Sequence, residues 1–511
     1  MSWTTIFINC RAYTINMAVK DLNKIFPKED SLLTKPRPYV NHSVEFKHPY
    51  SVKKRMEVLE KSGMNVFNFP AEMITGVDFL SDSGTTTMTN KQWASLHLGD
   101  ESYGSNKGYF QLKKQVQKIF GKEFFNDPNK QKPNAFIFHQ GRSCENALFS
   151  IIGRLGTGLI IPSNGHFDTT EANIMANKIQ ALNLFSKQLK DPLSNYHFKG
   201  DMDVDKLKDF LKKSHKKIPM GFLTITNNTG GGQPVSMNNV QQVSALMHKY
   251  DLPLFFDACR FSENAWFIKK YDKNYRNKSI KEIVKKMFTY VDGFTISFKK
   301  DGLVNMGGGL FIKEDGYFQK KYPQIADQII NLQILTEGHP TYGGMSGRDI
   351  MALVEGLKTV VELQYLDYRI NQVKTFCKSL VDKGIPVLTP PGGHAVYLDM
   401  NKFFEDTDKK PGDFGGIAFT ALLLGLYGHR ACELGNFAFG TYNSKTKKET
   451  FPEVNFVRFA IPRLRYEQQD LEAAAESIKV LYDYRKQIPS VKAIYGKELS
   501  LRHFKAKFKF K

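Results

Sequence analysis

The sequence is poor in cysteine, in long apolar runs and in repeated segments. Its five cysteines are scattered over 511 residues and none forms a C-x-x-C pair, which argues against a disulfide framework and a zinc ribbon. No stretch approaches the ~20 uninterrupted apolar residues that a membrane-spanning helix needs. We therefore expect a cytoplasmic protein, since the cytoplasm is a reducing environment, and we expect no membrane partner.

Acidic residues are also scarce relative to basic ones. Lysine and arginine total 72 against 51 aspartates and glutamates, which gives a formal net charge of +21. A basic surface attracts phosphate regardless of sequence, but these lysines are spread along the chain and no zinc-finger or RNP-type motif is present. We expect no nucleic-acid partner. The alternating tail 502–511 predicts an edge strand with lysines on one face.

The first twenty residues contain no acidic side chain and carry Arg11 and Lys20. This weakly resembles an organelle presequence but lacks its arginine-rich amphipathic pattern, so an organelle matrix stays an alternative location. Met17 is an alternative start. Residues 1–50, with several prolines, are expected to form an irregular arm.

Short apolar runs alternate with helical patterns between residues 135 and 313. Ser236 is a candidate N-cap for one of these helices. Alternating strands and helices predict a mostly parallel sheet with helices on both faces, an α/β fold. The expected buried strands are Ala135–Phe138, Gly158–Ile161, Gly221–Thr226, Leu252–Phe256, Gly293–Ser297 and Gly309–Ile312.

The C-terminal third has a different pattern, which predicts a smaller α+β domain. We expect an arm over 1–50, a large domain over 51–344 and a small domain over 345–511. Within the large-domain range, the part near 51–85 is expected to belong with the small domain. The expected elements outside the large sheet are helices at 52–62, 348–383, 417–427 and 468–486 and strands at 385–388, 394–399 and 454–460.

Polar motifs follow the expected strands, and ligands of open α/β sheets bind beyond the carboxyl ends of strands. After the first strand comes Gln140-Gly141-Arg142, followed by a helix. Backbone N–H groups at a helix N-terminus and an arginine side chain together suit a phosphate, to which Ser297 could also bind. The alternative is an ordinary turn.

Asp257 and Lys300 follow two other strands of the same sheet. A carboxylate such as Asp257 can keep a heterocyclic nitrogen protonated, although a salt bridge with Arg260 is the plainer alternative. Two adjacent lysines, Lys299 and Lys300, are costly to desolvate after a buried strand, and a lysine there suits Schiff-base chemistry. Together these groups predict a pyridoxal-phosphate enzyme with Lys300 as the Schiff-base lysine.

Longer motifs give the sequence a family resemblance. From about Phe46 to Phe504 it resembles the β-eliminating lyases, pyridoxal-phosphate enzymes with an aspartate-aminotransferase-like (fold type I) architecture. The motifs that carry this resemblance are Leu80-Ser81-Asp82-Ser83-Gly84-Thr85, Gly99-Asp100-Glu101-Ser102-Tyr103, His139-Gln140-Gly141-Arg142, Gly231-Gly232-Gln233-Pro234-Val235-Ser236, Arg260-Phe261-Ser262-Glu263-Asn264-Ala265, Pro340-Thr341-Tyr342-Gly343-Gly344 and Leu501-Arg502-His503-Phe504.

The resemblance implies roles for individual positions. Lys300 forms the Schiff base and then takes the substrate α-proton, Arg458 binds the substrate carboxylate and Tyr103 is a general acid. It also implies a homotetramer with sites at subunit contacts, and an activating monovalent cation, potassium, at Gly84, Glu101 and Asn305. The implied cofactor-binding residues are Ser81, Gln140, Gly141, Arg142, Phe167, Asn228, Asp257, Arg260, Ser297, Lys299 and Lys300.

Three positions favour the tryptophanase branch of this family over the tyrosine phenol-lyase branch. Asp168 and His503 match tryptophanase, and Leu434 stands where the phenol enzyme has an arginine. A carboxylate suits the single N–H donor of indole, whereas an arginine would be left unpaired by it. The predicted reaction is the β-elimination of L-tryptophan to indole, pyruvate and ammonia. Tyrosine phenol-lyase, a broad amino-acid β-lyase and a degenerate basic binding protein are the alternatives.

Some positions depart from the family pattern. Ser81 replaces a threonine, Lys107 an arginine and Ala258 a serine, and Thr229-Gly230 stands for Ser-Ala. Phe298 replaces a small residue beside the active lysines, where it is expected to add bulk close to the cofactor.

Overall fold

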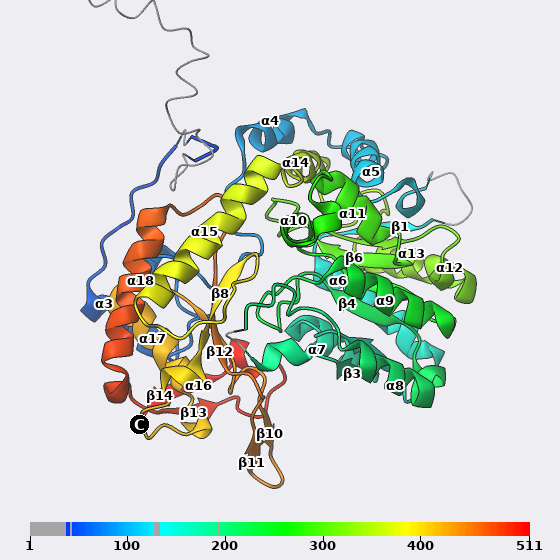
Figure 1. Ribbon diagram of the computed structural model, residues 1–511. Helices are drawn as coiled ribbons and strands as arrows, with labels where there is room; N and C mark the ends of the chain where they lie inside the picture. Colours follow the sequence, from blue (N-terminus) through cyan, green and yellow to red (C-terminus); the bar gives the residue numbers. More distant parts are fainter. Residues whose placement is uncertain (1–36, 41–42, 127–132, 192–193) are drawn as a thin grey trace, which may run out of the picture. The chain divides into compact units, whose positions relative to one another are not determined.

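The computed structural model describes residues 37–40, 43–126, 133–191 and 194–511 (Figure 1). Met17, the basic residues Arg11 and Lys20 and most of the expected arm lie outside them. The chain divides into two units, Met1–Glu45 and Phe46–Lys511, and the helices and strands below belong to the second. Among the described residues, no helix is long and apolar enough to cross a membrane.

The main sheet confirms the expected α/β pattern. Counted over the described residues, it has seven strands in the order β1-β7-β6-β5-β4-β2-β3. Neighbours from β6 to β3 are parallel, whereas β7 runs antiparallel to both β6 and β1. Only β3 was not predicted, because its residues are polar or half-buried. The bounds are β1 Ala135–Phe138, β2 Ile160–Ser163, β3 Gln180–Asn183, β4 Gly221–Thr224, β5 Leu254–Asp257, β6 Gly293–Ser297 and β7 Gly308–Ile312.

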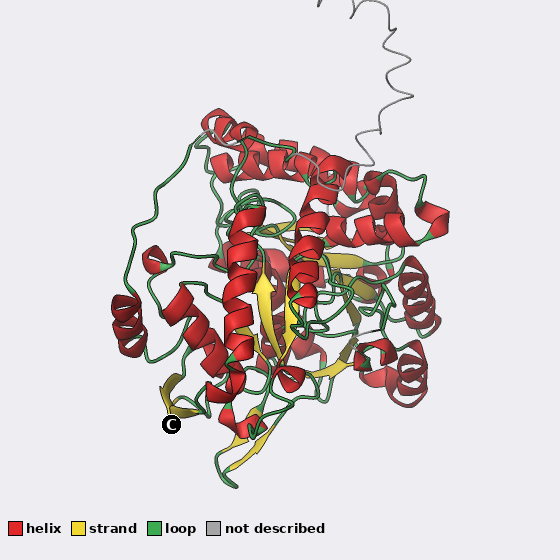
Figure 2. Cartoon of the chain, turned by 60° about the vertical axis from the view of Figure 1, so that its left-hand side comes forward, coloured by secondary structure: helices red, strands yellow, loops and turns green. Residues whose placement is uncertain are grey.

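Helices pack on both faces of this sheet, as Figure 2 shows in red around the yellow strands. Successive strand residues point to opposite faces, so Phe256 joins one hydrophobic cluster and Phe255 the other. One face contacts α4 Asn90–Leu98, α5 Lys107–Ile119, α8 Val204–Ser214, α9 Met237–Lys249, α10 Phe261–Tyr271, α11 Ile280–Phe288 and α14 Gly347–Thr359. The other contacts α6 Gly141–Ile152, α7 Asp168–Ala176, α12 Tyr317–Lys321 and α13 Ile325–Thr336.

A separate hydrophobic cluster, the small-sheet cluster, lies around a small antiparallel sheet in the order β8-β12-β9. It unites residues 59–79 with residues 373–508, so distant parts of the sequence share one core. The elements are α3 Val52–Lys61, α15 Leu363–Asp382, β8 Ala395–Asp399, α16 Met400–Phe403, α17 Gly415–Tyr427, β9 Cys432–Leu434, β10 Thr441–Asn443, β11 Lys448–Thr450, β12 Phe456–Ala460, α18 Gln468–Asp483, β13 Val491–Tyr495 and β14 Lys507–Phe510.

Three sequence expectations in this part were wrong. The helix expected over 348–383 is two helices, α14 and α15, separated at the buried β-branched residues Val360 and Val361. The strand expected at 385–388 makes only a single bridge, Val387 with Leu398, next to Pro386, which has no N–H to donate. In the tail the alternating strand with exposed lysines is confirmed as β14, and only its expected start at residue 502 was wrong, since residues 502–504 form a 3-10 turn.

The position of the domain boundary stays a prediction. Buried residues from Ile350 to Ile370 belong to one of the main-sheet clusters, and those from Val373 to Ile385 belong to the small-sheet cluster. This packing favours a boundary within α15 over the expected one at 344/345.

Candidate active site

A pocket lies at the carboxyl ends of β1, β5 and β6, which we call the Lys300 pocket. It brings together the sequence-predicted cofactor residues except Ser81, whose neighbour Ser83 lines the pocket in its place. Glu145, Thr169 and Cys259 were not predicted. The lining residues are Ser83, Gln140, Gly141, Arg142, Glu145, Phe167, Thr169, Asn228, Asp257, Cys259, Arg260, Ser297, Lys299 and Lys300.

The N-terminus of α6 forms one wall of this pocket. Gln140 is the N-cap residue and makes no side-chain capping bond within the described part of the chain. A β-carbon on Gly141 would lie 2.6 Å from the Ser297 β-carbon, so only glycine lets the helix start this close to β6. Helix N-termini bind anions through their first N–H groups, and Arg142 and Ser297 lie beside this one.

The ends of β5 and β6 contribute Asp257 and the two lysines to this pocket. Asp257 is the last residue of β5 and is buried, and Lys300 follows the neighbouring parallel strand β6. Lys300 Nζ donates to Cys259 Sγ at 3.7 Å. Burial, and then the nearby charges of Lys300 and Arg142, lower the pKa of Lys299.

Glu145 is a buried carboxyl that sequence reasoning missed. It accepts a hydrogen bond from Thr170 Oγ1 at 2.6 Å. Burial, and then the Asp257 carboxylate, raise the pKa of Glu145 to about 8. Its position in the second turn of α6, three residues after Arg142, was the signal that could have pointed to the pocket.

Arg260 reaches the pocket from a buried ion-pair network. Its guanidinium donates two hydrogen bonds to Asp82, at 3.0 and 2.7 Å, and Arg463 donates to the same carboxylate at 2.9 Å. Burial raises the pKa of Asp82, but the charges of Arg260, His394 and Arg463 outweigh it and hold that pKa well below its usual range. Asp82 therefore stays ionised and fixes the orientation of Arg260.

Asn228 connects the pocket to the small sheet. Tyr397 Oη donates to Asn228 Oδ1 at 2.7 Å, and Arg458 Nη1 lies 3.4 Å from the same oxygen. His394 Nε2 is 3.0 Å from it. In the described part of the chain Arg458 Nε is buried without a hydrogen-bond partner, although Nη2 donates to Leu80 O. Tyr397 and His394 were not predicted, because only the β8–β12 pairing places them here.

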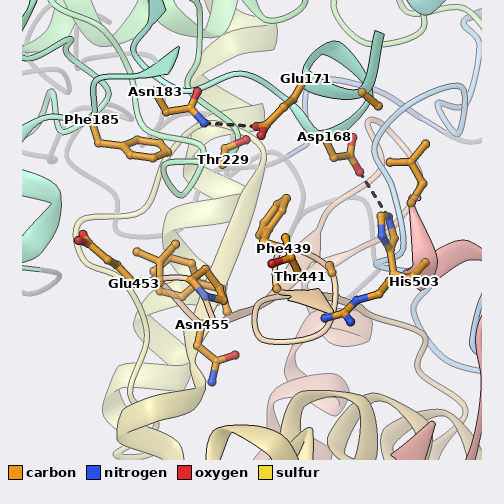
Figure 3. A pocket seen from close by; sticks show the side chains of 18 of the residues that line it. Asp168, Glu171, Asn183, Phe185, Thr229, Phe439, Thr441, Glu453, Asn455 and His503 are labelled. Atoms are coloured by element: carbon orange, nitrogen blue, oxygen red, sulfur yellow. Dashed lines mark hydrogen bonds and ion pairs between the residues drawn. The ribbon is translucent and has the colours of Figure 1, made fainter. Parts of the chain in front are cut away.

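A larger pocket of about 1250 Å³ lies next to it, which we call the Asp168 pocket (Figure 3). The start of α7 divides the two, since its N-cap Phe167 lines the Lys300 pocket and Asp168 lines the larger one. Asp168 Oδ2 and His503 Nε2 are 3.4 Å apart and both side chains are buried. The structure thus unites two predicted residues 335 positions apart in the sequence.

Apolar side chains form much of this second pocket. Phe185, Phe439 and Phe456 line it. Leu434 does not, but it pairs with Phe456 across β9 and β12 and is buried in the same cluster as Phe439.

The residues of the expected cation site do not all come together. Asn305 Nδ2 donates to Gly84 O at 3.1 Å, whereas Glu101 lies in another surface hollow, paired with Arg348. Tyr103 lines that same hollow and is 73% exposed. Among the described residues, no group of three acidic, histidine or cysteine side chains could hold a metal ion.

Phe298 turns away from the Lys300 pocket, contrary to the expectation that it adds bulk there. Its side chain is fully buried in the main-sheet cluster and makes an edge contact with Phe311. β-Carbons on Gly307 or Gly309 would lie 3.3 and 3.2 Å from Phe298 atoms, so two glycines of the facing segment make the room.

Solved structures show which fold this is. The chain is similar to an aromatic aminotransferase from Pyrococcus horikoshii OT3, with a TM-score of 0.54 and 14% identity over 85% of this chain and all of that chain. An aspartate aminotransferase from Thermotoga maritima gives a TM-score of 0.54 and 12% identity over 85% of this chain and 98% of that one. The fold is that of the aminotransferase-like, fold type I pyridoxal-phosphate enzymes.

Sequence comparisons identify the family. A family model described as "Beta-eliminating lyase" matches residues 78–477. A probable beta-eliminating lyase of Trichomonas vaginalis is 38% identical over 90% of this chain and 95% of its own length. A tryptophanase of Salinibacter ruber is 37% identical over 92% of this chain and 94% of its own length. A tyrosine phenol-lyase of Lacrimispora saccharolytica is 35% identical over 94% of this chain and 97% of its own length. The chain belongs to the β-eliminating lyase family, whose fold and membership imply pyridoxal phosphate as its cofactor.

Proposed function

We propose that this lyase converts L-tryptophan and water into indole, pyruvate and ammonia. Pyridoxal phosphate would be held by the residues of the Lys300 pocket. The observation that carries the substrate assignment is the buried Asp168–His503 pair on the wall of the larger, aromatic-lined pocket. A tyrosine-cleaving or broad amino-acid β-lyase is the alternative.

The residues of the Lys300 pocket fit this cofactor. The uncapped start of α6, with Gly141 against Ser297 and with Arg142 beside it, suits a phosphate. Phe167 is available to stack on an aromatic ring, and Asp257 to bind a protonated ring nitrogen. When bound, pyridoxal phosphate supplies an electron sink that acidifies the Cα–H of an amino acid.

The chain's own residues then divide the remaining work. The Arg458 guanidinium binds the substrate carboxylate, a role supported by its buried Nε without a partner in the described residues. The amine of Lys300 accepts the proton from Cα. Asn228 and Arg260, fixed by Tyr397 and Asp82, bind the cofactor's phenolic oxygen.

The leaving group lies in the Asp168 pocket. Indole is flat and apolar with a single N–H donor, so the aromatic lining accommodates the ring and the Asp168 carboxylate accepts the N–H. His503, at 3.4 Å, orients that carboxylate. The bond that breaks joins Cβ to the indole ring, and the ring carbon takes up a proton as it leaves.

Assembly and the cation complete the proposal. Tyr103 is exposed and lines neither of the two pockets, so a role as general acid places it in the site of a second subunit of a homotetramer. Glu101 is exposed and lies beside Tyr103, whereas Gly84 and Asn305 contact each other at a different place. A potassium ion bound by Glu101, Gly84 and Asn305 would therefore take its ligands from two subunits.

The decisive experiment is an assay of the purified protein with tryptophan, tyrosine and S-alkyl cysteines. Indole without phenol supports the proposal, and phenol without indole overturns it. Lys300→Ala should remove both the covalent attachment of pyridoxal phosphate and the activity. Lys313→Ala, at the end of β7 and outside both pockets, is the matched control and should retain both.

A further inference from the structure

Cys259 links the ends of β5 and β6 around Lys300. Because these strands are parallel neighbours, the segment after Asp257 runs beside the segment after Ser297. The Ser297 N–H donates to Cys259 Sγ at 3.3 Å, and the Asp301 N–H donates to the Cys259 carbonyl oxygen at 3.3 Å. One residue in the turn after β5 thus holds the backbone on both sides of Lys300.

Cys259 also contacts the two charged groups near it, through different atoms. Lys300 Nζ donates to Cys259 Sγ at 3.7 Å, and the Cys259 backbone N–H donates to Asp257 Oδ1 at 3.4 Å. Burial, and then the Asp257 carboxylate, raise the pKa of the Cys259 thiol. It therefore remains a neutral thiol, which can accept a hydrogen bond from the lysine amine. Such a thiol does not act as a nucleophile.

The environment of Cys259 differs from that of the other described cysteines. Cys144, Cys377 and Cys432 are buried, whereas Cys259 is partly exposed and lines the Lys300 pocket. A thiol that only filled space in the core would not face a pocket between a lysine and an aspartate.

We propose that Cys259 is a positioning residue for Lys300: its backbone N–H is bound to Asp257, and its sulfur, held by the Ser297 N–H, accepts a hydrogen bond from the lysine amine and aims that amine into the pocket. The inference rests on the proposed role of Lys300 as the reactive amine. It predicts that Cys259 acts on the amine's proton affinity and reactivity, beyond its effect on stability.

The test compares Cys259→Ala and Cys259→Ser with Cys377→Ala, a buried thiol in α15 outside both pockets. Pyridoxal phosphate is added to each full-length cofactor-free protein, and samples are reduced with borohydride at successive times to trap the cofactor attached to Lys300. The mass of the Lys300 peptide then gives the rate of attachment. The visible absorption of the loaded proteins is then titrated with pH.

Cys259→Ala should slow attachment at least threefold and shift the spectroscopic pKa by at least 0.5 unit, because Lys300 loses its sulfur partner. Cys259→Ser keeps a hydrogen-bond donor and acceptor, so its attachment rate and spectroscopic pKa should lie close to those of the wild type. Cys377→Ala should match the wild type in both. The inference is overturned if Cys259→Ala matches the wild type or if serine loses as much as alanine. Failure of wild-type Lys300 to take the cofactor would instead overturn the proposed function.

Discussion

Asp168 is bound on two sides before any substrate arrives. Its Oδ1 accepts the Thr169 N–H at 2.6 Å, and its Oδ2 lies 3.4 Å from His503 Nε2. An N-cap role is excluded for it, because Phe167 is the N-cap residue of α7. The Asp168 carboxylate is thus oriented into the aromatic pocket by one backbone and one side-chain partner.

Asp168→Asn should reduce kcat/KM for tryptophan at least tenfold, because an amide accepts the indole N–H less strongly than a carboxylate. Elimination from an S-alkyl cysteine, whose leaving group has no N–H, should fall much less. Steady-state assays with both substrates measure this. Asp205→Asn, an exposed carboxylate on α8 that pairs with Lys187, is the control. Equal losses with both substrates would contradict the assignment.

Glu145 makes the stability of the cofactor-free protein depend on pH. Its pKa of about 8 in the folded chain exceeds its ordinary value of 4.5, so between these pH values the folded state holds a proton that the unfolded state has released. The contribution of Glu145 to the free energy of unfolding should therefore be fully present below pH 4.5 and should be lost as pH rises to 8.

Glu145→Gln should flatten this dependence, since glutamine does not titrate. Urea unfolding of the cofactor-free protein at pH 5, 6, 7 and 8 measures the slope for both proteins. If the wild type and the variant show the same slope over this interval, Glu145 is not the responsible group.

At the scale of elements, the turn after β6 sends neighbouring side chains in opposite directions. Lys299 and Lys300 line the pocket, whereas Phe298 packs into the core against Gly307, just before β7, and Gly309, within β7. A bulky residue beside the lysines is tolerated here because the facing strand has no side chains at the point of contact.

Phe298→Ala should cost about 3–5 kcal/mol of folding free energy, the usual cost of removing a buried phenylalanine. The spectroscopic pKa of the bound cofactor should stay within 0.2 unit of the wild type, because Phe298 does not line the pocket. Urea unfolding and a pH titration of the absorption measure the two effects. A large spectroscopic shift without loss of stability would place Phe298 at the cofactor.

At the scale of the second unit, a buried ion-pair network ties its two cores together. Arg463, after β12, contacts Asp82, Glu263 and Asp301 at 2.9, 2.7 and 3.0 Å. Arg369 of α15 contacts Glu263 at 3.1 Å. These side chains are almost fully buried, so removing one charge leaves its partners uncompensated in a medium of low polarity.

Asp82→Asn should lower the free energy of unfolding by about 3–5 kcal/mol, because Arg260 and Arg463 lose their shared carboxylate. It should also weaken cofactor binding through Arg260. Asp406→Asn breaks an exposed pair with Arg485 and should lower the free energy of unfolding far less, because solvent screens that pair. Urea unfolding of the two variants measures the two free energies of unfolding. If both variants lose the same small amount of free energy, the network is not stabilising.

The sequence by itself determined the α/β class, the main-sheet strands except β3, and the residues of the Lys300 pocket except Glu145, Thr169, Cys259 and Ser83. The physical reason is local. Buried parallel strands are short apolar runs, and in an open sheet the residues just beyond their carboxyl ends necessarily meet at one edge.

Only the tertiary structure decided what depends on contacts between distant segments. It paired Asp168 with His503, attached Tyr397 and Arg458 to Asn228, turned Phe298 into the core, and separated Glu101 and Tyr103 from the two pockets. None of these has a local signal, because a side chain's partner and direction depend on the packing of elements far away in sequence. Cys259 belongs to this group, since only the pairing of β5 with β6 brings its sulfur to Lys300.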